Sequence, residues 1–423
     1  MFTTLGLQNF KNFRKATLDL GPFTVLVGAN ASGKSNLRDA FRFLHGIGRG
    51  YDLGRILDGA HGEGGENVWQ EIRGGAQNIS FKDAPDFNLD AQLGGSPPRR
   101  YQISVRSPSK QQSIRPLLPR LKHEQLMLDE TQEVIFSTLV GDEVAGDEVR
   151  IRSSNSEGYV KREFGKDRPI LERMTSSLHD PHTDFSYAFE HCLQVGTHFH
   201  SMRFLEFDPR ALRMSSKAAQ TTLGQRGENL ASVLMDLCQD NAKKDTLIEW
   251  LQILTPMDAK DLQFSVAEHT NEVTLVLIEQ DGTETPMQSA SDGTLRFLGL
   301  LALLFQDDPP TLLFLEEVET GLHPTRLDLL VNLIEQRTTQ TDTQVIATTH
   351  SPQLLEVLSQ DTLEDVQLVY RTGDGPEAQI CPLLEVPSAR RVLAKPDQRV
   401  GDLHQSGWFE NAMAFSGSRP VSP

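Results

Sequence analysis

One octapeptide constrains the fold of this 423-residue chain more than any other feature, the glycine-rich stretch Gly28–Ser35. Its letters, GANASGKS, match the phosphate-binding pattern G-x-x-x-x-G-K-[S/T] at every fixed position. The apolar segment LGPFTVLVGA precedes it and predicts a buried strand, and NLRDAFRFLHGI follows with the apolar spacing of a helix. A strand, a loop and a helix in this order surround a phosphate with backbone N–H groups and a helix N-terminus. The stretch therefore predicts a nucleotide site.

Each polar group of the motif has an expected role. Lys34 is expected to neutralise the β- and γ-phosphates, and the Ser35 hydroxyl is expected to bind Mg²⁺. The loop that holds the phosphates is expected to comprise Asn30, Ala31, Ser32, Gly33, Lys34, Ser35 and Asn36. The alternative is a chance glycine loop, which the flanking strand and helix disfavour.

A second apolar strand, TLLFLEE, ends in two carboxylates, Glu316 and Glu317. Glu316, at the strand tip, is predicted to hold Mg²⁺ through water, although aspartate is commoner at this position. Glu317 is predicted to orient and deprotonate the attacking water. The alternative, a solvated pair at the end of a strand, is disfavoured by the intact phosphate loop.

Two more segments are candidates for the same site. Ser291-Asp292-Gly293-Thr294 precedes the apolar helix LRFLGLLALLF, and a serine and N–H groups at a helix N-terminus can bind a γ-phosphate. Most such strings are turns or helix caps, so the interpretation depends on its place just before the carboxylate strand. His350, at the end of the apolar strand TQVIATTHS, can contact the γ-phosphate or the attacking water; otherwise it is a structural cap.

Strands and helices alternate in the last third of the chain, and the strands are continuously apolar. This order is typical of an α/β fold whose mostly parallel sheet is covered on both faces. The middle of the chain contains strand-like and helical pieces, without an internal repeat and without sustained heptads.

The order of these motifs, from the phosphate loop through SDGT and LLFLEEVETGLHP to TTHSP, resembles the ABC-type ATPases of the SMC, RecF and overcoming-lysogenization-defect group. The likeness covers about residues 1–81 and 273–370. It is greatest for the short AAA-family "predicted ATPase" branch of bacterial genome maintenance and phage defence. The resemblance implies ATP and Mg²⁺ as ligands, ATP hydrolysis, and an antiparallel strand region at the N-terminus.

Within that group, Ser291–Thr294 would be the signature motif, Glu319–Pro324 the D-loop and His350 the switch histidine. The resemblance also implies a head-to-tail homodimer that encloses ATP, with Ser291 of one copy completing the site of the other. Two features depart from the group. The magnesium-binding Q-loop glutamine has no firm match, and Gln77, after RGGA, is the candidate. The arginine common after the first strand is replaced by Lys11-Asn12-Phe13.

Relatives in this group carry coiled-coil arms between the two halves of the site, or a nuclease domain after the switch histidine. Neither pattern is present, so we expect a compact α+β insertion and no nuclease activity in this chain. The expected divisions are residues 1–81 as the N-terminal lobe, 82–272 as the insertion, 273–370 as the C-terminal lobe and 371–423 as an extension.

The formal net charge of −17 argues against a surface that is basic overall. One local exception is the stretch 96–123, which contains no acidic residue and is either a solvated loop or a contact for DNA. Its basic residues are Arg99, Arg100, Arg106, Lys110, Arg115, Arg120 and Lys122.

No apolar run is long enough for a membrane helix, and three scattered cysteines suit a reducing cytosol. A cytoplasmic location and no contact with the membrane are therefore expected. His191, His198 and His200 are spaced too loosely for a predicted metal site.

Three functions stay open on the sequence alone. The first is a sensor or regulatory ATPase of an anti-phage defence or DNA repair complex, which controls a separately encoded effector such as a nuclease. The second is an ATPase clamp that binds DNA directly through the basic stretch. The third is the nucleotide-binding subunit of a transporter, which the GLHP segment and the first strand disfavour.

Overall fold

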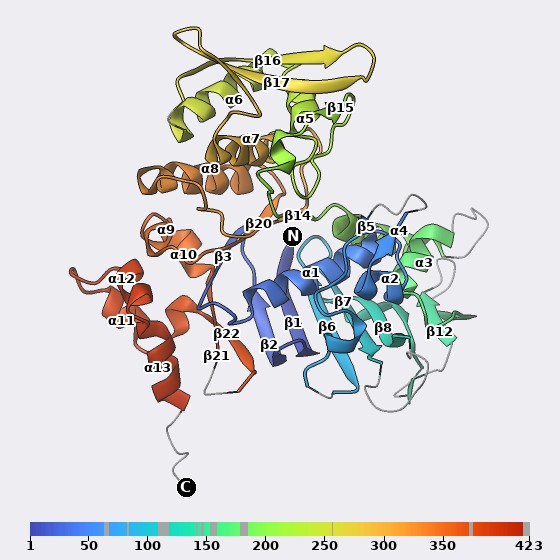
Figure 1. Cartoon of the computed structure of the whole chain (residues 1–423). Coiled ribbons are helices and arrows are strands. Elements are labelled where there is room, and N and C mark those ends of the chain that lie inside the picture. Colours follow the sequence, from blue (N-terminus) through green and yellow to red (C-terminus); the bar gives the residue numbers. More distant parts are fainter. Residues whose placement is uncertain are drawn as a thin grey trace.

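A six-stranded sheet forms the centre of the protein in the computed structural model (Figure 1). The strand order is β14 (Arg203–Leu205), β19 (Leu312–Leu315), β20 (Gln344–Thr348), β3 (Phe23–Val27), β21 (Val366–Arg371) and β22 (Ala378–Pro382). Only β22 runs antiparallel to its neighbour. Every residue of β3, β19 and β20 is buried, because continuous apolar strands need cover on both faces. The expected α/β class with a mostly parallel sheet is confirmed.

The structure describes residues 1–62, 67–82, 84–108, 118–140, 143–144, 148–152, 159–177, 185–255, 257–371 and 375–417. Among these, no helix has the length and apolar character needed to cross a membrane.

The two faces of the central sheet enter different hydrophobic cores. Phe23, Val25 and Val27 of β3 enter a core that also contains residues of α7 (Asp292–Leu304) and α8 (Leu327–Gln340). Leu26 points the other way, into a core shared with α1 (Lys34–Gly48) and α4 (Ser186–His200). Because side chains of β3 point alternately to the two faces of the sheet, this strand contributes to both hydrophobic cores.

An eight-stranded antiparallel sheet, sheet A, packs on the second core. Its strands are, in spatial order, β13 (Tyr159–Glu163), β12 (Glu148–Arg152), β9 (Glu133–Ser137), β8 (Arg120–Leu128), β7 (Arg99–Arg106), β6 (Asp86–Leu93), β1 (Phe2–Phe10) and β2 (Phe13–Asp19). Buried and partly exposed residues alternate along β6, which is typical of a sheet with one covered face. Gln344 joins the two sheets, because its side chain bonds the backbone N–H and C=O of Phe2 and the C=O of Gly21.

A third group of elements lies at the top of Figure 1. It combines α5 (Leu230–Leu237) and α6 (Asn241–Leu254) with the strands β15 (Ser216–Lys217), β16 (Ala259–Ala267), β17 (Glu272–Glu279) and β18 (Glu284–Pro286). This group packs on α7 through the first core.

The stretch 82–272, expected as one compact insertion, thus contributes to three different sheets. Strands β6 to β9, β12 and β13 extend sheet A, β14 joins the central sheet, and β15 to β17 belong to the third group. The expected boundaries at residues 82 and 272 do not coincide with the edges of these sheets, because the pairing partners lie far apart in the sequence.

Residues 375–417 extend the central sheet by one strand and pack against the first core. Strand β22 pairs with β21, and Phe409 is fully buried in the first core. Gly401 donates its N–H to Glu356 Oε1 at 2.6 Å, which ties the C-terminal helices to the segment after His350. The helices of this part are α9 (Pro352–Glu356), α10 (Gln360–Glu364), α11 (Ala389–Leu393), α12 (Val400–Gln405) and α13 (Trp408–Gly417).

The remaining described elements are short. They are the helices α2 (Leu53–Asp58) and α3 (Ile170–Ser177), the strands β4 (Ala60–His61), β5 (Asn67–Trp69), β10 (Leu139–Val140) and β11 (Glu143–Val144), and the 3-10 turns η1 (Ala76–Asn78), η2 (Ala211–Arg213), η3 (Pro324–Arg326) and η4 (Leu383–Glu385).

A buried carboxylate fastens sheet A to α3. Glu124 accepts hydrogen bonds from the Tyr101 hydroxyl at 2.8 Å and from the N–H groups of Ile170 and Leu171 at 2.5 and 2.9 Å. Burial raises the pKa of Glu124 from 4.5 to about 7, although these hydrogen bonds oppose the shift.

This raised pKa predicts a pH dependence of stability. Above pH 4.5 the unfolded chain loses the Glu124 proton while the folded chain keeps it, so stability falls as the pH rises and the loss is complete above about 7. Relative to Glu124→Gln, which cannot ionise, the wild type should lose on the order of 3 kcal/mol between pH 5 and 8. Urea unfolding of both proteins at the two pH values measures this difference. Parallel pH profiles would contradict it.

Candidate nucleotide-binding site

The loop between β3 and α1 needs glycine at two positions. Gly28 has φ of +145° and Gly33 has φ of +129°, values that side-chain-bearing residues rarely adopt. A Cβ at Gly28 would lie 2.0 Å from the Val369 carbonyl oxygen, and one at Gly33 would lie 2.9 Å from Asn12 Nδ2. The loop therefore fits tightly against β21 and against the turn between β1 and β2.

That turn carries Lys11-Asn12-Phe13, one of the two departures from the resembling group, and it supports the loop. Asn12 Nδ2 donates to the Ser32 carbonyl at 3.1 Å, and Asn12 Oδ1 accepts from Asn36 Nδ2 at 2.7 Å. Asn12 thus connects the end of the loop to the first turn of α1.

Lys34 is the first residue of α1. Its Nζ donates to the carbonyl oxygens of Gly28 and Ala29 at 2.6 and 3.1 Å, so the amine turns back into the loop. Burial lowers the pKa of Lys34 to about 8, although Glu317 opposes the shift. Gly33 caps α1 without a side-chain acceptor, which leaves the first N–H groups of the helix available to an anion.

One cavity of about 340 Å³ brings together most of the residues expected from the sequence. Its lining includes the loop residues Asn30, Ala31, Ser32, Gly33, Lys34, Ser35 and Asn36, both carboxylates Glu316 and Glu317, and Thr348, His350, Arg73 and Arg371. Three parallel strands supply these groups at their carboxyl ends, since β3, β19 and β20 are adjacent. This is the edge at which an open α/β sheet usually binds its ligand.

Glu317 has a strained backbone with φ of +48°. Its N–H donates to Thr348 Oγ1 at 3.1 Å, and its Oε2 accepts from Thr320 Oγ1 at 3.3 Å. The first contact holds the Glu317 backbone just after β19, and the second restrains the carboxylate.

Glu316 has one oxygen engaged and one oxygen free. Its Oε2 accepts from Arg38 NH1 at 2.9 Å, whereas Oε1 is buried with no hydrogen-bond partner. The Ser32 hydroxyl, which belongs to a residue of the same cavity lining, is also buried without a partner. Oxygen donors of this kind suit Mg²⁺, so the residues present fit the expected metal.

His350 is held by its backbone. Its N–H donates to Glu319 Oε1 at 3.1 Å, and the same oxygen accepts from Thr349 Oγ1 at 2.8 Å. Glu319 is the first residue of the expected D-loop. Burial lowers the pKa of His350, and the nearby Lys34 adds to this effect.

The four residues Ser291–Thr294 lie elsewhere. Ser291 caps α7, and its Oγ accepts from the Thr294 N–H at 3.1 Å. Asp292 pairs with Arg213 at 2.6 Å. Ser291, Gly293 and Thr294 line a second cavity of about 260 Å³, together with Gly321, Leu322 and His323. Within one chain they do not meet the phosphate loop.

Gln77, the candidate Q-loop residue, is exposed in η1 and does not belong to the cavity lining. Two arginines that the sequence reasoning missed do line it. Arg73 lies four residues earlier and pairs with the buried Asp39 at 3.4 Å. Arg371 is the last residue of β21, one position beyond the expected lobe boundary. In the sequence, Arg371 directly follows the apolar run of β21, and this position could have identified it as a site residue.

Neighbouring side chains contact three residues of the basic stretch, and carboxylates neutralise two of these three. Arg99 donates to His191 Nδ1, Arg100 pairs with Asp90 at 2.6 Å and Lys122 with Asp86 at 2.6 Å. Arg106 and Arg120 are exposed and lie directly opposite each other on β7 and β8. Lys110 and Arg115 lie outside the described residues.

The three histidines with loose spacing have structural surroundings. His191 accepts from Arg99, His198 packs its ring against Phe2, and His200 Nδ1 bonds the Gly48 carbonyl at 3.1 Å. In the described part of the chain, no group of three or more His, Cys, Asp or Glu residues is arranged to hold a metal.

Comparison with known proteins gives a family and several relatives. The model of the family described as "AAA domain, putative AbiEii toxin, Type IV TA system" matches residues 23–356. An "ATP/GTP phosphatase" of Helicobacter pylori (strain ATCC 700392 / 26695) is 21% identical over 369 residues, which cover 85% of this chain and 88% of that protein.

Two solved structures are similar at low identity. One is the SMC head bound to the C-terminal winged-helix domain of ScpA, with 12% identity, a TM-score of 0.49 and coverage of 90% of this chain and 97% of that one. The other is the SMC head domain from Thermotoga maritima, with 13% identity, a TM-score of 0.40 and coverage of 90% and 98%. Because the family model spans well over half of its length, this chain belongs to the AAA-domain family named above.

Proposed function

We propose that this protein is an ATPase that closes as a head-to-tail dimer around ATP and uses that closure to control a separate effector. Its family and the phosphate loop support ATP hydrolysis by the chain. The observation that carries the dimer is the separation of two half-sites. Lys34, Ser35, Glu316, Glu317 and His350 share one cavity, whereas Ser291–Thr294 line another.

Each half-site lacks what the other offers. The lining of the first cavity includes a lysine, hydroxyl groups and two carboxylates, and among the described helices only α1 contributes residues of its first turn to it. The second cavity opens at the N-terminus of α7, where an anion would be stabilised by the helix dipole. Two copies related by a two-fold axis can bring the N-terminus of α7 in one copy to the γ-phosphate held by the other.

The residues of the first cavity divide the reaction between them. Lys34 and the loop N–H groups hold the phosphates, and Arg73 and Arg371 add positive charge at the cavity wall. Ser35 and Glu316 would hold Mg²⁺, which neutralises charge on the transferred phosphoryl group when it is bound. Glu317, fixed by Thr348 and Thr320, orients the attacking water and accepts its proton. His350 lines the same cavity and would contact the γ-phosphate or that water.

The dimer is tested by the mass of a variant that binds ATP without hydrolysing it. In Glu317→Gln the amide cannot accept the proton, so ATP should persist and hold two copies together. Light scattering after size exclusion should give one chain mass without ATP and twice that mass with ATP and Mg²⁺. An unchanged mass, in a variant that demonstrably retains bound ATP, rules the dimer out.

We assign the effector to a different protein. The described residues hold no acidic cluster suited to a metal nuclease. Co-expression with the products of neighbouring genes, followed by purification of the Glu317→Gln protein with ATP, should recover the effector. Recovery that is equal with and without ATP would separate the effector from the ATP cycle.

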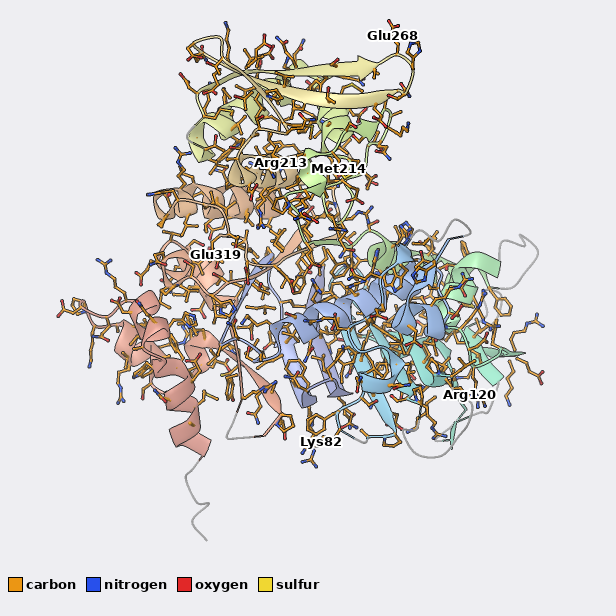
Figure 2. The ribbon with its side chains drawn as sticks, in the orientation of Figure 1. Lys82, Arg120, Arg213, Met214, Glu268 and Glu319 are labelled. Atoms are coloured by element: carbon orange, nitrogen blue, oxygen red, sulfur yellow. The ribbon has the colours of Figure 1, made fainter. Side chains whose placement is uncertain are left out.

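A second candidate function is direct binding to DNA. It is favoured by Arg106 and Arg120, which are exposed and lie opposite each other on one face of the sheet. Two like charges in this arrangement repel each other, and a phosphate bound between them would relieve the repulsion. Figure 2 shows Arg120 at the outer end of sheet A, well away from Glu319 beside the nucleotide cavity.

Changing both residues to alanine should weaken DNA binding and lower the slope of log affinity against log salt by about 2, since each phosphate contact releases a counterion. Fluorescence anisotropy of labelled duplex DNA at several salt concentrations measures the slope. Arg100→Ala is the matched control, because Asp90 already neutralises Arg100. Equal slopes for the wild type and the double variant would remove this function.

A further inference from the structure

Two carboxylates occupy equivalent places at the ends of adjacent strands. β14 and β19 run parallel with Leu205 opposite Leu315, so the next residues, Glu206 and Glu316, lie at the same edge of the sheet. Glu316 lines the nucleotide cavity, and Glu206 does not. Sequence reasoning singled out Glu316 alone, because the three-residue strand β14 is not recognisable from its letters.

One guanidinium connects the two carboxylates. Arg38 NH1 lies 2.9 Å from Glu316 Oε2 and 3.4 Å from Glu206 Oε2. The Arg38 side chain is only 7% exposed, whereas those of Glu316 and Glu206 are 25% and 57% exposed. Arg38 comes from the second turn of α1, directly after the phosphate loop, and stays behind Glu316 rather than in the cavity lining.

We propose that Arg38 is a positioning residue that releases Glu316 to the metal by transferring its hydrogen bond to Glu206. This inference rests on the proposed function, since it concerns the Mg²⁺ that accompanies ATP. When Arg38 holds Glu316, the carboxylate is oriented and neutralised. A divalent cation on the free Oε1 of Glu316 and a buried guanidinium on Oε2 of the same carboxylate repel each other, which favours a turn of Arg38 to another acceptor.

Glu206 is the acceptor within reach of the same nitrogen. A buried arginine left without a partner would be strongly unfavourable, and Glu206 avoids that state. The buried Nε of Arg38 has no hydrogen-bond partner, so a single terminal nitrogen makes the contacts of the guanidinium with both carboxylates. A single-nitrogen contact shared between two carboxylates allows the transfer with a small rotation of the guanidinium.

The test measures metal binding directly. In the Glu317→Gln background with ATP, electron paramagnetic resonance of free Mn²⁺ gives the dissociation constant of the metal. Arg38→Gln removes the competing cation and should tighten Mn²⁺ about fivefold, within the range of couplings between contacting residues. Glu206→Gln leaves Arg38 only a neutral amide oxygen as the alternative to Glu316, which is a weaker acceptor, and should weaken Mn²⁺ about fivefold.

The double variant separates transfer from simple charge effects. If Glu206 acts only through Arg38, then Arg38→Gln combined with Glu206→Gln should bind Mn²⁺ like Arg38→Gln alone. Additive shifts would mean that Glu206 acts on the metal through space, and they would overturn the proposal. Arg100→Gln is the control, since it removes an arginine from a comparable pair in sheet A and should leave Mn²⁺ binding unchanged.

The Mn²⁺ result can be distinguished both from misfolding of a variant and from failure of the proposed function. Glu206 is exposed, so Glu206→Gln folds even where Arg38→Gln does not, and the sign of its effect decides the case. An unchanged or tightened Mn²⁺ affinity in Glu206→Gln overturns the transfer. Failure of the Glu317→Gln protein to bind both ATP and Mn²⁺ would instead overturn the proposed function.

Discussion

Mixing two inactive variants, Glu317→Gln and Ser291→Arg, is expected to restore ATP hydrolysis. Glu317→Gln lacks the base but keeps the N-terminus of α7, and Ser291→Arg keeps the first cavity but blocks the second. In a mixed dimer one site carries both defects and the other carries neither. Random association makes about half of the dimers mixed, so the rate should reach about a quarter of the wild-type value.

The measurement is phosphate release from the two proteins, each alone and premixed before ATP is added. Both variants keep the first cavity and can hold ATP, and a mixed dimer closes through the α7 N-terminus of its Glu317→Gln copy. The matched control is a mixture of Glu317→Gln with the double variant Glu317→Gln/Ser291→Arg, which contains no intact base and should remain inactive. If the first mixture stays at the sum of its parts, the site is not shared between copies.

The nucleotide site could be predicted from the sequence because its groups follow strands that are apolar throughout. β3, β19 and β20 are fully buried runs, and each is followed at once by its functional residues. Local letters suffice in such cases, since a parallel strand is recognised from one continuous apolar segment. The cap of α7 at Ser291 was predictable for a similar reason, because the serine directly precedes a strongly apolar helix, in which ten of the 13 residues are buried.

The remainder depends on pairings between distant segments. β14 has only three residues, and it is a strand because Leu313, Phe314 and Leu315 lie beside it, more than 100 positions further along the chain. The link from Arg38 to Glu206 follows from that pairing and has no local signal. Arg73 enters the cavity through its loop and its contact with Asp39, whereas the glutamine pattern directed attention to Gln77, which is exposed.

The middle of the chain illustrates the same limit at a larger scale. β6 alternates buried and partly exposed residues, which predicts a strand but not its partner. Its partners are β7 and β1, and β1 lies on the other side of the boundary predicted at residue 82. The insertion at residues 82–272 was predicted from the absence of heptads. Its N-terminal boundary therefore divides strands β1 and β2 from strands β6 to β9, although all of them belong to sheet A.

Replacing Lys34 by alanine is expected to have the largest effect on turnover. Nζ is the only ammonium in the lining of the first cavity as described, and it donates to the carbonyl oxygens of Gly28 and Ala29. When phosphates enter, the amine can exchange those carbonyls for oxygens that carry charge, which is a stronger interaction. We expect the rate of ATP hydrolysis to fall at least about 100-fold, since the lost group stabilises charge in the transition state.

The matched control is Lys11→Met, because Lys11 is also buried near the loop but directs its amine to Asp39 at 3.1 Å rather than into the cavity. Arg73 remains beside Asp39, so the carboxylate keeps a cation in this variant. Lys11→Met should unfold at a lower temperature and still bind ATP, whereas Lys34→Ala should fold normally and lose tight binding. Thermal unfolding with and without ATP and Mg²⁺ separates the two effects. A Lys34→Ala protein that is stabilised by ATP as much as the wild type and hydrolyses it at a similar rate would place the phosphates elsewhere in the protein.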